Sequence, residues 1–520
     1  EVVTRFPPEP SGYLHIGHAK AVLLNQYYAQ RYNGKLLVRF DDTNPTKEKE
    51  EFEENILQDL RSLGVIPHQI SHTSDHFETC ERLARQLIAD GLGYMDDTEQ
   101  EIMQAERLNK IDSRRRNSSV EENLAVFERL LKGESDAQKF CLRAKIDMSS
   151  VNGTMRDPVL YRYCGGVPHH RHGTRYQAYP TYDFACPIVD SVEGVTHALR
   201  TTEYNDRDEQ YHWIQNALRL RPVHIHAFGK MNFVNTVLSK RKLTWFVEQG
   251  LVEGWNDPRF PTVQGCVRRG VDVDALKRFI ISQGASRRVI TMEWDKFWAE
   301  NKRVLEEKCV RYMGVSLEPA APAVLTVSNH FPGRSDDDDT ITEHVHSVPL
   351  HPQHPELGTR PMRRGRNVLL DQVDAQLLKV GEEVTLLRWG NVRIDGIEKS
   401  GDNTVIRIYG EYLPNATNFS KTRKLSWLTQ SADNVSALLV DFDHLLSKSK
   451  IEEEEDFRNF VNPVTRRHTS ALVDPILRTL TSGTVLQLER KGFYRLDQAY
   501  DATNGQTTIT LFSIPDGKKQ

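Results

Sequence analysis

The chain has 520 residues, of which 38% are hydrophobic and 27% charged, and its formal net charge is -4. One hydrophobic core rarely serves so long a chain, so we expect about three to five domains. No apolar run is long enough to span a bilayer, which argues against membrane function. The small net charge does not exclude a nucleic-acid surface, because basic patches can coexist with acidic runs.

The six cysteines are scattered along the chain without any CxxC pair. This spacing argues against a disulfide framework and against a thiolate zinc site, and it predicts a reducing, cytoplasmic compartment. No signal-peptide pattern opens the chain. Because the chain begins inside a probable strand, we expect that sequence upstream of it exists.

The first forty residues predict a compact strand, helix and strand. Residues 1–6 are strand-like, a helical pattern starts near His18 and stops at Asn33-Gly34, and a second strand covers 36–40. In such a βαβ unit the ligand binds at the carboxyl ends of the strands. The residues that follow each strand are therefore candidate binding residues.

The tetrapeptide His15-Ile16-Gly17-His18 lies at this edge, at the start of the predicted helix. Its imidazoles, its glycine and the positive end of the helix dipole suit a phosphate group. Asp41-Asp42 follows the second strand at the same edge. Each motif has an alternative interpretation, since the histidines could cap the helix and the aspartates could begin a turn.

A comparable unit returns about 140 residues later. The apolar run 182–189 leads into 195–200, then into a helical pattern around Tyr211 and a strand at 224–227. The basic stretch 239–242 follows. Three cations in four residues usually form a solvated face, but after a second half-sheet a lysine can reach a triphosphate.

Four ordered motifs resemble those of a known family. Residues 6–18 resemble the first signature of class I aminoacyl-tRNA synthetases, and 237–241 resemble the second, in the variant of the glutamyl and glutaminyl enzymes. Residues 40–45 and 179–184 also match this subgroup, so the resemblance reaches from Arg5 to about Trp298. In the second signature Val237 replaces the first lysine and Arg241 the final serine. Phosphate contact there rests on Lys240.

The resemblance implies that ATP and an amino acid meet in this crevice, where the amino-acid carboxylate attacks the α-phosphate without a protein nucleophile. His15, His18 and Lys240 are the expected catalytic residues, which supply hydrogen-bond donors and positive charge, while Mg²⁺ shields the pyrophosphate. The residues expected to bind ATP are Glu9, Ser11, His15, Gly17, His18, Thr201, Lys230, Met231, Leu238, Ser239 and Lys240.

By the same resemblance Arg5, Asp41 and Tyr182 line the amino-acid pocket, and Asp41 accepts hydrogen bonds from the substrate ammonium. Arg200 carries the specificity, because glutaminyl enzymes have an uncharged residue at the matching place. An arginine can form a bidentate pair with a γ-carboxylate. The alternative is a structural ion pair of Arg200 with Glu203 or Glu193.

No residue is expected to bind a metal ion. The loop from Cys164 to His172 contains one cysteine and three histidines, which invites a zinc interpretation. It lacks the paired ligand spacing of a zinc site, so we expect a solvated loop.

The resemblance implies a multi-domain α/β protein with a Rossmann-like catalytic domain. The expected segments are its first half at 1–73, an α/β acceptor-arm-binding insertion at 74–178, its second half with the lysine loop at 179–250, a helical connecting domain at 251–318 and two anticodon-binding β-barrels at 319–520. Helical patterns at 272–283 and 291–302 and strand patterns at 384–389, 404–409 and 485–490 fit this order. The β-type tail favours the eukaryotic and archaeal type, because the bacterial glutamyl type ends in helices.

Basic and aromatic residues of the tail are candidate contacts to unpaired bases, which stack on aromatic rings or guanidinium planes. These candidates are Arg363, Arg364, Arg366, the stretch 421–424 and Trp427.

The expected activity is that of a ligase, a glutamyl-tRNA synthetase of the eukaryotic and archaeal type. It would convert L-glutamate and ATP to glutamyl-adenylate and transfer the glutamyl group to tRNA(Glu), and a multi-synthetase assembly is a further candidate partner. The nearest alternative is a glutaminyl-tRNA synthetase, which shares every motif except the context of Arg200. A non-catalytic tRNA-binding scaffold is the third, and His15, His18, Asp41 and Lys240 argue against it.

Overall fold

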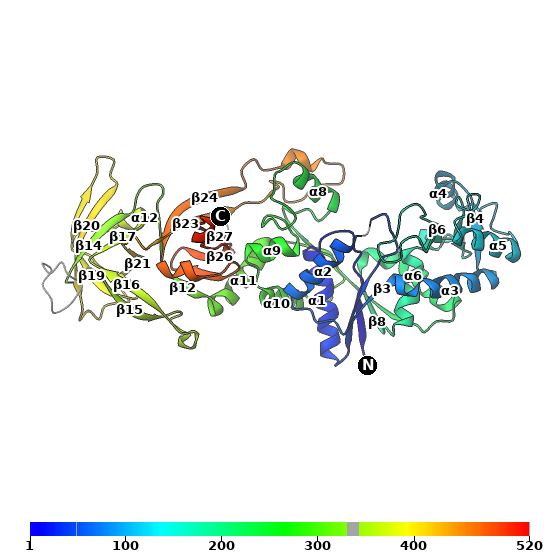
Figure 1. Ribbon diagram of the computed structural model, residues 1–520, viewed down its shortest axis with the longest axis horizontal. Helices are drawn as coiled ribbons and strands as arrows, with labels where there is room; N and C mark the ends of the chain where they lie inside the picture. The colour runs from blue at the N-terminus through cyan, green and yellow to red at the C-terminus, as the bar shows by residue number, and fades with distance from the viewer. Residues whose placement is uncertain (48, 330–342, 519–520) are drawn as a thin grey trace.

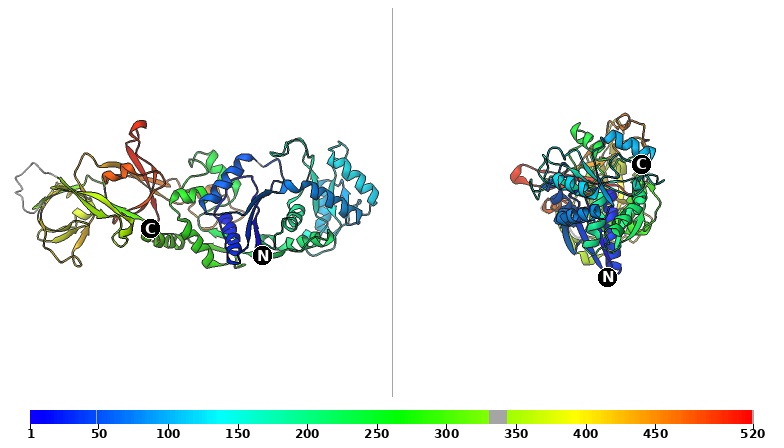
Figure 2. Two further views of the ribbon diagram at one scale, coloured as in Figure 1. Left: turned by 60° about the horizontal axis from the view of Figure 1, so that its bottom comes forward. Right: turned by 90° about the vertical axis from the view of Figure 1, so that its right-hand side faces the viewer.

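The structure is a computed structural model that describes residues 1–47, 49–329 and 343–518. It is elongated, with the insertion at one end, the parallel strands of the first 72 residues in the middle and the β-rich residues after Val310 at the other end (Figures 1 and 2). The α/β, helical and all-β parts of the chain thus lie along the long axis, with the insertion at the end opposite the β-rich part.

The predicted strand, helix and strand at the start of the chain are present. β1 (Val3–Phe6), β2 (Lys35–Phe40) and β3 (Gln69–His72) form a parallel sheet in the order β1-β2-β3. α1 (Ile16–Arg31) joins β1 to β2, and α2 (Glu50–Ser62) joins β2 to β3. The ends of β1 and β2 lie at one edge, as the motif argument requires.

A second, two-stranded parallel sheet lies beside β1. β8 (His197–Thr201) pairs with β9 (His224–Phe228), and α7 (Asp208–Ala217) connects them. The amide of Thr196 donates to the carbonyl oxygen of Val3 at 2.9 Å. Two segments almost 200 residues apart in sequence thus share one layer.

The apolar run 182–189 is helical, and the interpretation of it as part of a strand-led unit is wrong. It belongs to α6 (Tyr182–Val192), which starts with Asp183 in its first turn and contains Pro187. A continuous apolar run of eight residues fits a buried helix as well as a buried strand, so periodicity alone could not decide. An acid in the first turn favours a helix start.

The insertion is an antiparallel sheet with helices, as predicted. Its strands follow the order β4 (Gly93–Asp96), β5 (Cys141–Ala144), β6 (Val159–Tyr163) and β7 (Ala178–Pro180). Its helices are α3 (Phe77–Ala89), α4 (Gln100–Asn109) and α5 (Val120–Leu131). Residues of α3, α5 and α6 share one hydrophobic cluster, so the insertion packs directly on the catalytic half that follows it.

The segment after the lysine loop is helical, with one difference from prediction. It contains α8 (Lys240–Glu248), α9 (Val263–Arg269), α10 (Val273–Gln283) and α11 (Trp294–Lys308). Thr291, predicted to be helical, lies instead in the short strand β11 (Ile290–Met292). This strand pairs in parallel with β10 (Met231–Phe233), and the backbone pairing delays the helix start.

The C-terminal region contains two curled seven-stranded sheets, in agreement with the predicted strands. The proximal sheet has the order β12 (Val310–Tyr312), β25 (Val485–Leu488), β26 (Gly492–Gln498), β27 (Thr508–Ile514), β23 (Val435–Phe442), β24 (Arg466–Val473) and β13 (Gly314–Ser316). Its two edge strands, β12 and β13, are separated in the chain by Met313 alone. Such a sheet has to curl until its edges meet.

The distal sheet follows the same rule. Its order is β21 (Arg423–Leu425), β18 (Glu383–Leu386), β19 (Gly390–Lys399), β20 (Val405–Leu413), β14 (Ala323–Ser328), β17 (Asn367–Leu370) and β22 (Leu428–Thr429). Only Ser426 and Trp427 separate the edge strands β21 and β22. A hairpin of β15 (Glu343–Pro349) and β16 (Thr359–Gly365) and the short helix α12 (Gln372–Ala375) complete this end.

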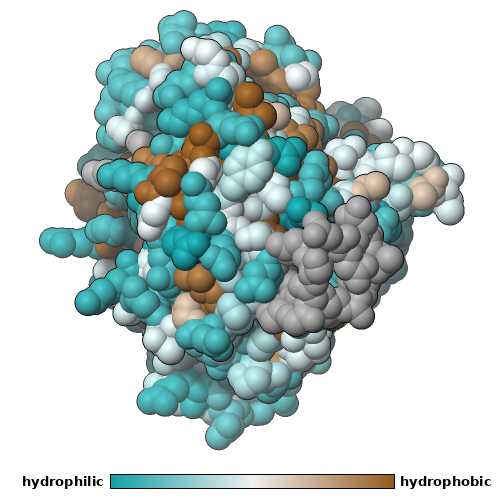
Figure 3. All heavy atoms as spheres, turned by 90° about the vertical axis from the view of Figure 1, so that its left-hand side faces the viewer, coloured by the Kyte–Doolittle hydropathy of each residue, from teal (hydrophilic) through white to brown (hydrophobic). Residues whose placement is uncertain are grey.

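The surface of the distal end is mostly hydrophilic, with apolar patches between polar side chains (Figure 3). Exposed apolar side chains at the distal end include Ile406 and Tyr409 of β20, Val373 of the helix 372–375, and Leu377, Val380 and Phe419 of loops. Among the described residues no helix is long and apolar enough to cross a membrane. All six cysteines are free thiols.

Candidate nucleotide and amino-acid site

The two histidines at the start of α1 cap the helix and also reach the predicted site. His15 is the N-cap: its Nδ1 accepts from the amide of Gly17 at 3.1 Å, and the amide of His15 donates to Nδ1 of His18 at 3.1 Å. The alternative interpretation, capping, is therefore correct for Nδ1 of both rings. Because Nδ1 accepts, Nε2 carries the proton of each neutral imidazole and can donate to a ligand.

Both rings are neutral at physiological pH. Burial, the stacked ring of His18 and the ammonium of Lys230 lower the pKa of His15 to about 2. Burial and Lys230 lower the pKa of His18 to about 4. In the free protein the two imidazoles therefore offer N–H donors without a formal charge.

The two signature segments meet although more than 200 residues separate them. A Cβ added to Gly17 would lie 2.9 Å from Cε1 of His15 and 3.9 Å from Cδ1 of Leu238. A Cβ added to Gly12 would lie 3.4 Å from Cε and 3.5 Å from Nζ of Lys240. Glycine at both positions lets the lysine loop approach the first signature closely. Sequence reasoning did not single out Gly12.

Lys240 is the first residue of α8, and its side chain lies near an aromatic ring, one carboxylate and two other lysines. Its Nζ lies 5.3 Å from the centre of the Phe52 ring. Partial burial lowers its pKa, Glu9 opposes this effect, and Lys47 and Lys49 add to it. An additional anion would relieve this crowding of cations, which is what a triphosphate supplies.

The other predicted ATP residues surround these two signatures. Ser11 Oγ donates to Glu9 at 3.0 Å, and Lys230 pairs with Glu203 at 3.0 Å. Thr201 ends β8, Met231 is buried in β10, and Ser239 is the N-cap of α8. The site therefore draws on both halves of the parallel sheet.

The segment before α8 is held by the C-terminal half of the chain. Asn235 donates through its amide to the carbonyl oxygen of Ser449 at 2.9 Å and through Nδ2 to that of Leu446 at 3.1 Å. Thr236 accepts from Nε1 of Trp294 at 2.9 Å. Residues at the boundary of the proximal sheet thus help to position Lys240.

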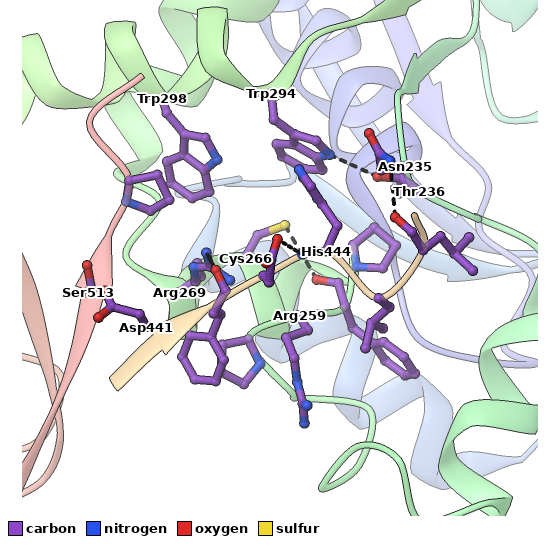
Figure 4. A pocket seen from close by; sticks show the side chains of 18 of the residues that line it. Asn235, Thr236, Arg259, Cys266, Arg269, Trp294, Trp298, Asp441, His444 and Ser513 are labelled. Atoms are coloured by element: carbon purple, nitrogen blue, oxygen red, sulfur yellow. Dashed lines mark hydrogen bonds between the residues drawn. The ribbon is translucent and has the colours of Figure 1, made fainter. Parts of the chain in front are cut away.

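A cavity of about 380 Å³ lies at this junction, between α9 and α11 on one side and β23 and β27 on the other. Figure 4 shows Trp294 and Trp298 on one side of it and Arg259 on the opposite side. The predicted site residues are absent from its described lining. It is a junction between parts of the chain, and of the two signatures only Val237 lines it among the described residues.

Asp41 is buried, as a residue that binds a substrate ammonium should be. Burial, the neighbouring Asp42 and Glu9 raise the pKa of Asp41 to about 7, although Thr43 Oγ1 donates to it at 3.2 Å. The amide of Asp41 donates to the carbonyl oxygen of Pro8 at 2.9 Å, which joins the two predicted loops. A cation bound here would stabilise the ionised carboxylate.

Arg5 lies in the predicted pocket but is engaged by a residue that sequence reasoning missed. Its Nε donates to both oxygens of Asp190 at 3.0 and 3.1 Å, and Nη1 donates to the carbonyl oxygen of Leu199 at 3.2 Å. Asp190 also pairs with Arg39 at 2.5 Å and accepts from Tyr211 at 2.7 Å. All four residues are buried. Arg5 therefore holds the two half-sheets together at the site.

Changing Asp190 to asparagine is expected to lower the free energy of unfolding by about 3–5 kcal/mol, because it leaves the buried guanidinium of Arg5 without its counter-ion and that of Arg39 with Glu193 alone. Burial opposes ionisation, but Arg5 and Arg39 hold the pKa of Asp190 well below its usual range. The stabilisation is thus present above a pH of about 4 and is lost as the pH falls through the lowered pKa. Chemical denaturation at several pH values measures both effects.

Asp90→Asn, which breaks the exposed pair with Arg219, should cost less than about 1 kcal/mol. A similar small cost for Asp190→Asn would contradict the prediction.

Arg200 is buried without a carboxylate at hydrogen-bonding distance. Its side chain is 5% exposed, its Nε and Nη1 have no hydrogen-bond partner among the described residues, and the nearest paired carboxylate, Asp208, lies 4.0 Å from Nη1. The guanidinium lies over the rings of Tyr204 at 4.7 Å and Tyr211 at 5.3 Å. Burying a guanidinium without hydrogen-bond acceptors costs folding free energy unless a bound ligand supplies those acceptors.

The alternative partners considered for Arg200 are engaged elsewhere. Glu203 pairs with Lys230 at 3.0 Å, and Glu193 pairs with Arg39 at 2.9 Å. The predicted pocket residue Tyr182 is near Arg200, because the guanidinium influences the Tyr182 pKa, which burial raises well above its usual value. A carboxylate that entered here could accept hydrogen bonds from Nε and Nη1 of Arg200, which have no such partner among the described residues.

Two expectations about exposed residues are wrong. Trp427 is 2% exposed and donates through Nε1 to the carbonyl oxygen of Leu387 at 2.8 Å, so it cannot stack on a base. The histidine loop is not simply solvated, since His169 is 2% exposed and its Nε2 lies 2.9 Å from the carbonyl oxygen of Asp42. A local sequence does not reveal that a tryptophan covers the gap between two edge strands, or that a loop folds back over a distant turn.

Two signatures from distant segments, with N–H-donating imidazoles at a helix start and a lysine close to Gly12, form the arrangement that the resemblance to class I synthetases predicts for a nucleotide site. The chain belongs to the class I tRNA synthetases of the glutamyl and glutaminyl (E and Q) group. The model of the catalytic domain of that group matches residues 1–307, and models of its anti-codon binding domain match 309–413 and 424–497. ATP is a substrate of this class.

Curated relatives agree with this placement. The chain is 48% identical over 520 residues to the cytoplasmic glutamate–tRNA ligase of Saccharomyces cerevisiae, and 46% identical over 519 residues to a probable cytoplasmic glutamate–tRNA ligase of Schizosaccharomyces pombe. Both comparisons cover 100% of this chain and 70% of the relative. The bifunctional glutamate/proline–tRNA ligase of Mus musculus is 47% identical over 523 residues, covering 99% of this chain. The chain spans about a third of that relative, 34% of its length.

Proposed function

We propose that this chain activates L-glutamate with ATP to glutamyl-adenylate and transfers the glutamyl group to tRNA(Glu). The observation that carries the choice of amino acid is the buried guanidinium of Arg200, whose Nε and Nη1 have no hydrogen-bond partner among the described residues and whose nearest paired carboxylate, Asp208, is 4.0 Å away. A γ-carboxylate would supply its missing acceptors, whereas the amide of glutamine would leave the buried charge uncompensated. The names of the relatives support the same choice.

In the proposed site Asp41 binds the ammonium of glutamate and Arg200 binds its side-chain carboxylate. Tyr182 lies beside Arg200, and Arg5 fixes the wall of the pocket through its pair with Asp190. With both ends of the amino acid held, its α-carboxylate is the free nucleophile. Correct placement alone can supply a large share of the rate acceleration.

The α-carboxylate oxygen attacks the α-phosphorus of ATP, the bond to the bridging oxygen breaks, and pyrophosphate leaves. Nε2–H of His15 and of His18 donate to phosphate oxygens, and Lys240 supplies the positive charge. Glu9, Ser11, Gly17, Thr201, Lys230, Met231, Leu238 and Ser239 are proposed to hold the nucleotide. Mg²⁺ is proposed to enter with ATP as part of the substrate.

The fold proposal follows the same assignment. The parallel sheet β1-β2-β3 and the adjoining parallel pair β8-β9 are proposed to form a Rossmann-like core at 1–73 and 179–250, and the two curled sheets to be anticodon-binding β-barrels within 319–520. The insertion at 74–178 is proposed to bind the acceptor arm of the tRNA. Residues 251–318 are proposed to form a helical domain that connects the catalytic domain to the β-barrels. A cytoplasmic location and a multi-synthetase assembly remain predictions.

The pH dependence of glutamate use tests the role of Asp41. Because the pKa of Asp41 in the free enzyme is about 7, kcat/KM for glutamate should fall about tenfold for each pH unit below 7 as the carboxylate is protonated. Asp41→Asn should lower kcat/KM at pH 8 and flatten this acid limb. Steady-state charging between pH 5.5 and 8.5 measures it, and a slope that survives in Asp41→Asn would assign the titration to another group.

Charging of purified tRNA(Glu) with radiolabelled glutamate tests the whole proposal. Glutamate should be transferred only when ATP and tRNA(Glu) are both present, and glutamine should not replace it. If the chain charged tRNA(Gln) efficiently with glutamine and did not use glutamate, it would be a glutaminyl enzyme. Tight tRNA binding without adenylate formation, measured as pyrophosphate exchange with tRNA present, would make it a scaffold.

A further inference from the structure

A cluster of two histidines and one glutamate lies beside the proposed site and has no part in the proposed reaction. His72 Nε2 lies 2.9 Å from one carboxylate oxygen of Glu53, and His170 Nε2 lies 2.7 Å from the other. The three ligand atoms lie within 4.8 Å of one another. Each side chain is mostly buried, with 10–16% of its surface exposed.

The three residues come from three different elements. Glu53 lies in the first turn of α2, His72 ends β3, and His170 lies in the histidine loop of the insertion. Two imidazoles therefore converge on one carboxylate across the boundary between the catalytic core and the insertion. Although burial favours the neutral acid, the hydrogen bonds from His170 and His72 lower the pKa of Glu53 to about 2, so it is an anion.

A second group, Asp42 with His169 and His170, also has ligand-like spacing. Its carboxylate is already engaged, because Asp42 accepts from the amide of Ser74 at 2.8 Å and from its Oγ at 2.6 Å. These bonds fix Asp42 as a structural acceptor. The Glu53 group is the better candidate because its carboxylate faces two imidazole nitrogens.

We propose that Glu53, His72 and His170 bind one divalent transition-metal ion of the Zn²⁺ class. Two imidazoles and one carboxylate are a donor set that suits this ion and leave one position for water. Zn–N and Zn–O distances of about 2.0–2.2 Å place neighbouring tetrahedral ligand atoms about 3.4 Å apart. The present hydrogen-bonding distances would have to open by roughly half an ångström, which side-chain rotation supplies.

The ion would fasten the insertion to the catalytic core next to the lysine loop. Phe52 is the neighbour of Glu53 in the chain. The centre of its ring lies 6.0 Å from the centre of the Tyr13 ring and 5.3 Å from Nζ of Lys240. A metal that fixes α2 therefore also fixes the wall of the proposed nucleotide site. The role is that of a positioning site, because none of its ligands contacts the predicted reacting atoms.

Zinc binding by the full chain tests the proposal directly. After chelator treatment and removal of the chelator, the protein should take up one equivalent of Zn²⁺ in equilibrium dialysis followed by elemental analysis. Co²⁺ in its place should give the visible absorption of a tetrahedral site. Glu53→Gln preserves side-chain size and should weaken the affinity at least tenfold, as should His72→Asn and His170→Asn.

The exposed pair of His354 and Glu356 offers a matched control, because it has the same chemistry at a 2.8 Å distance without a second histidine on the carboxylate. His354→Asn should leave the stoichiometry and affinity unchanged. Circular dichroism of each variant establishes that it is folded, and Glu53→Gln is the variant least disturbed in shape. Binding lost in Asp42→Asn but kept in Glu53→Gln would overturn the proposed ligand set.

Absence of tight Zn²⁺ and Co²⁺ uptake by the folded wild-type chain would overturn the proposal altogether. The cluster would then be a hydrogen-bonded junction only. Both outcomes are independent of the proposed function, because neither dialysis nor absorption requires ATP, glutamate or tRNA. A chain that charges tRNA normally but binds no metal would contradict this inference and leave the proposed function intact.

Discussion

Replacing Arg200 by cysteine is expected to lower kcat/KM for glutamate by about 10³-fold, because it removes the buried partner of the γ-carboxylate. Glutamine charging should fall far less. The free protein should be no less stable, since the change removes a buried cation whose Nε and Nη1 lack hydrogen-bond partners among the described residues. Steady-state charging with each amino acid and thermal unfolding measure these effects together.

Arg207 provides the matched control for this experiment. It lies over the same Tyr204 ring at 5.3 Å, but it is 42% exposed and pairs with Asp183 at 3.3 Å. Arg207→Cys should change glutamate kcat/KM by less than about threefold. An Arg200→Cys variant that keeps its glutamate kcat/KM and unfolds more easily would show that Arg200 is structural.

Replacing Lys240 by alanine is expected to lower the rate of tRNA-dependent pyrophosphate exchange by about 10²–10³-fold. The lysine is the charged residue of the second signature that lies close to Gly12 of the first. Its loss removes positive charge where the pyrophosphate leaves, so kcat should fall more than the KM for ATP rises. Exchange measured at saturating glutamate and tRNA separates the two parameters.

Lys242 is two residues further along the same helix and faces elsewhere. Its Nζ lies 5.6 Å from the Phe457 ring, beside the acidic run from Glu453 to Asp456. Lys242→Ala should leave the exchange rate within about twofold. Equal losses in both variants would mean that α8 acts through its general charge or its fold, and the specific role of Lys240 would be wrong.

The sequence predicted the elements that carry their own local signal. The glycine and histidines of the first signature, the strand ends at Phe6 and Phe40 and the alternating strands of the tail all follow from short-range patterns. The role of Lys240 at the phosphates was implied by the resemblance, but its close approach to Gly12 was not predicted. This approach became visible only in three dimensions.

The remaining features depend on contacts between distant residues. The neutrality of His15 and His18 results from burial beneath Lys230, and the engagement of Arg5 depends on Asp190. Neither effect leaves a mark within a few residues of the affected side chain. For the same reason the histidine loop resembled a solvated segment, although it folds back onto the turn that contains Asp42.

The position of Asp190 in the chain has a consequence for synthesis on the ribosome. Arg5 and Arg39 emerge 185 and 151 residues before the aspartate that neutralises them. At a synthesis rate of about 5–20 residues per second, Asp190 is made roughly ten to forty seconds after the first strands. Until then two cations oppose burial of β1 and β2. The insertion, which is made during this interval, can complete its own antiparallel sheet first, so we expect the peripheral domain to fold before the core that carries it.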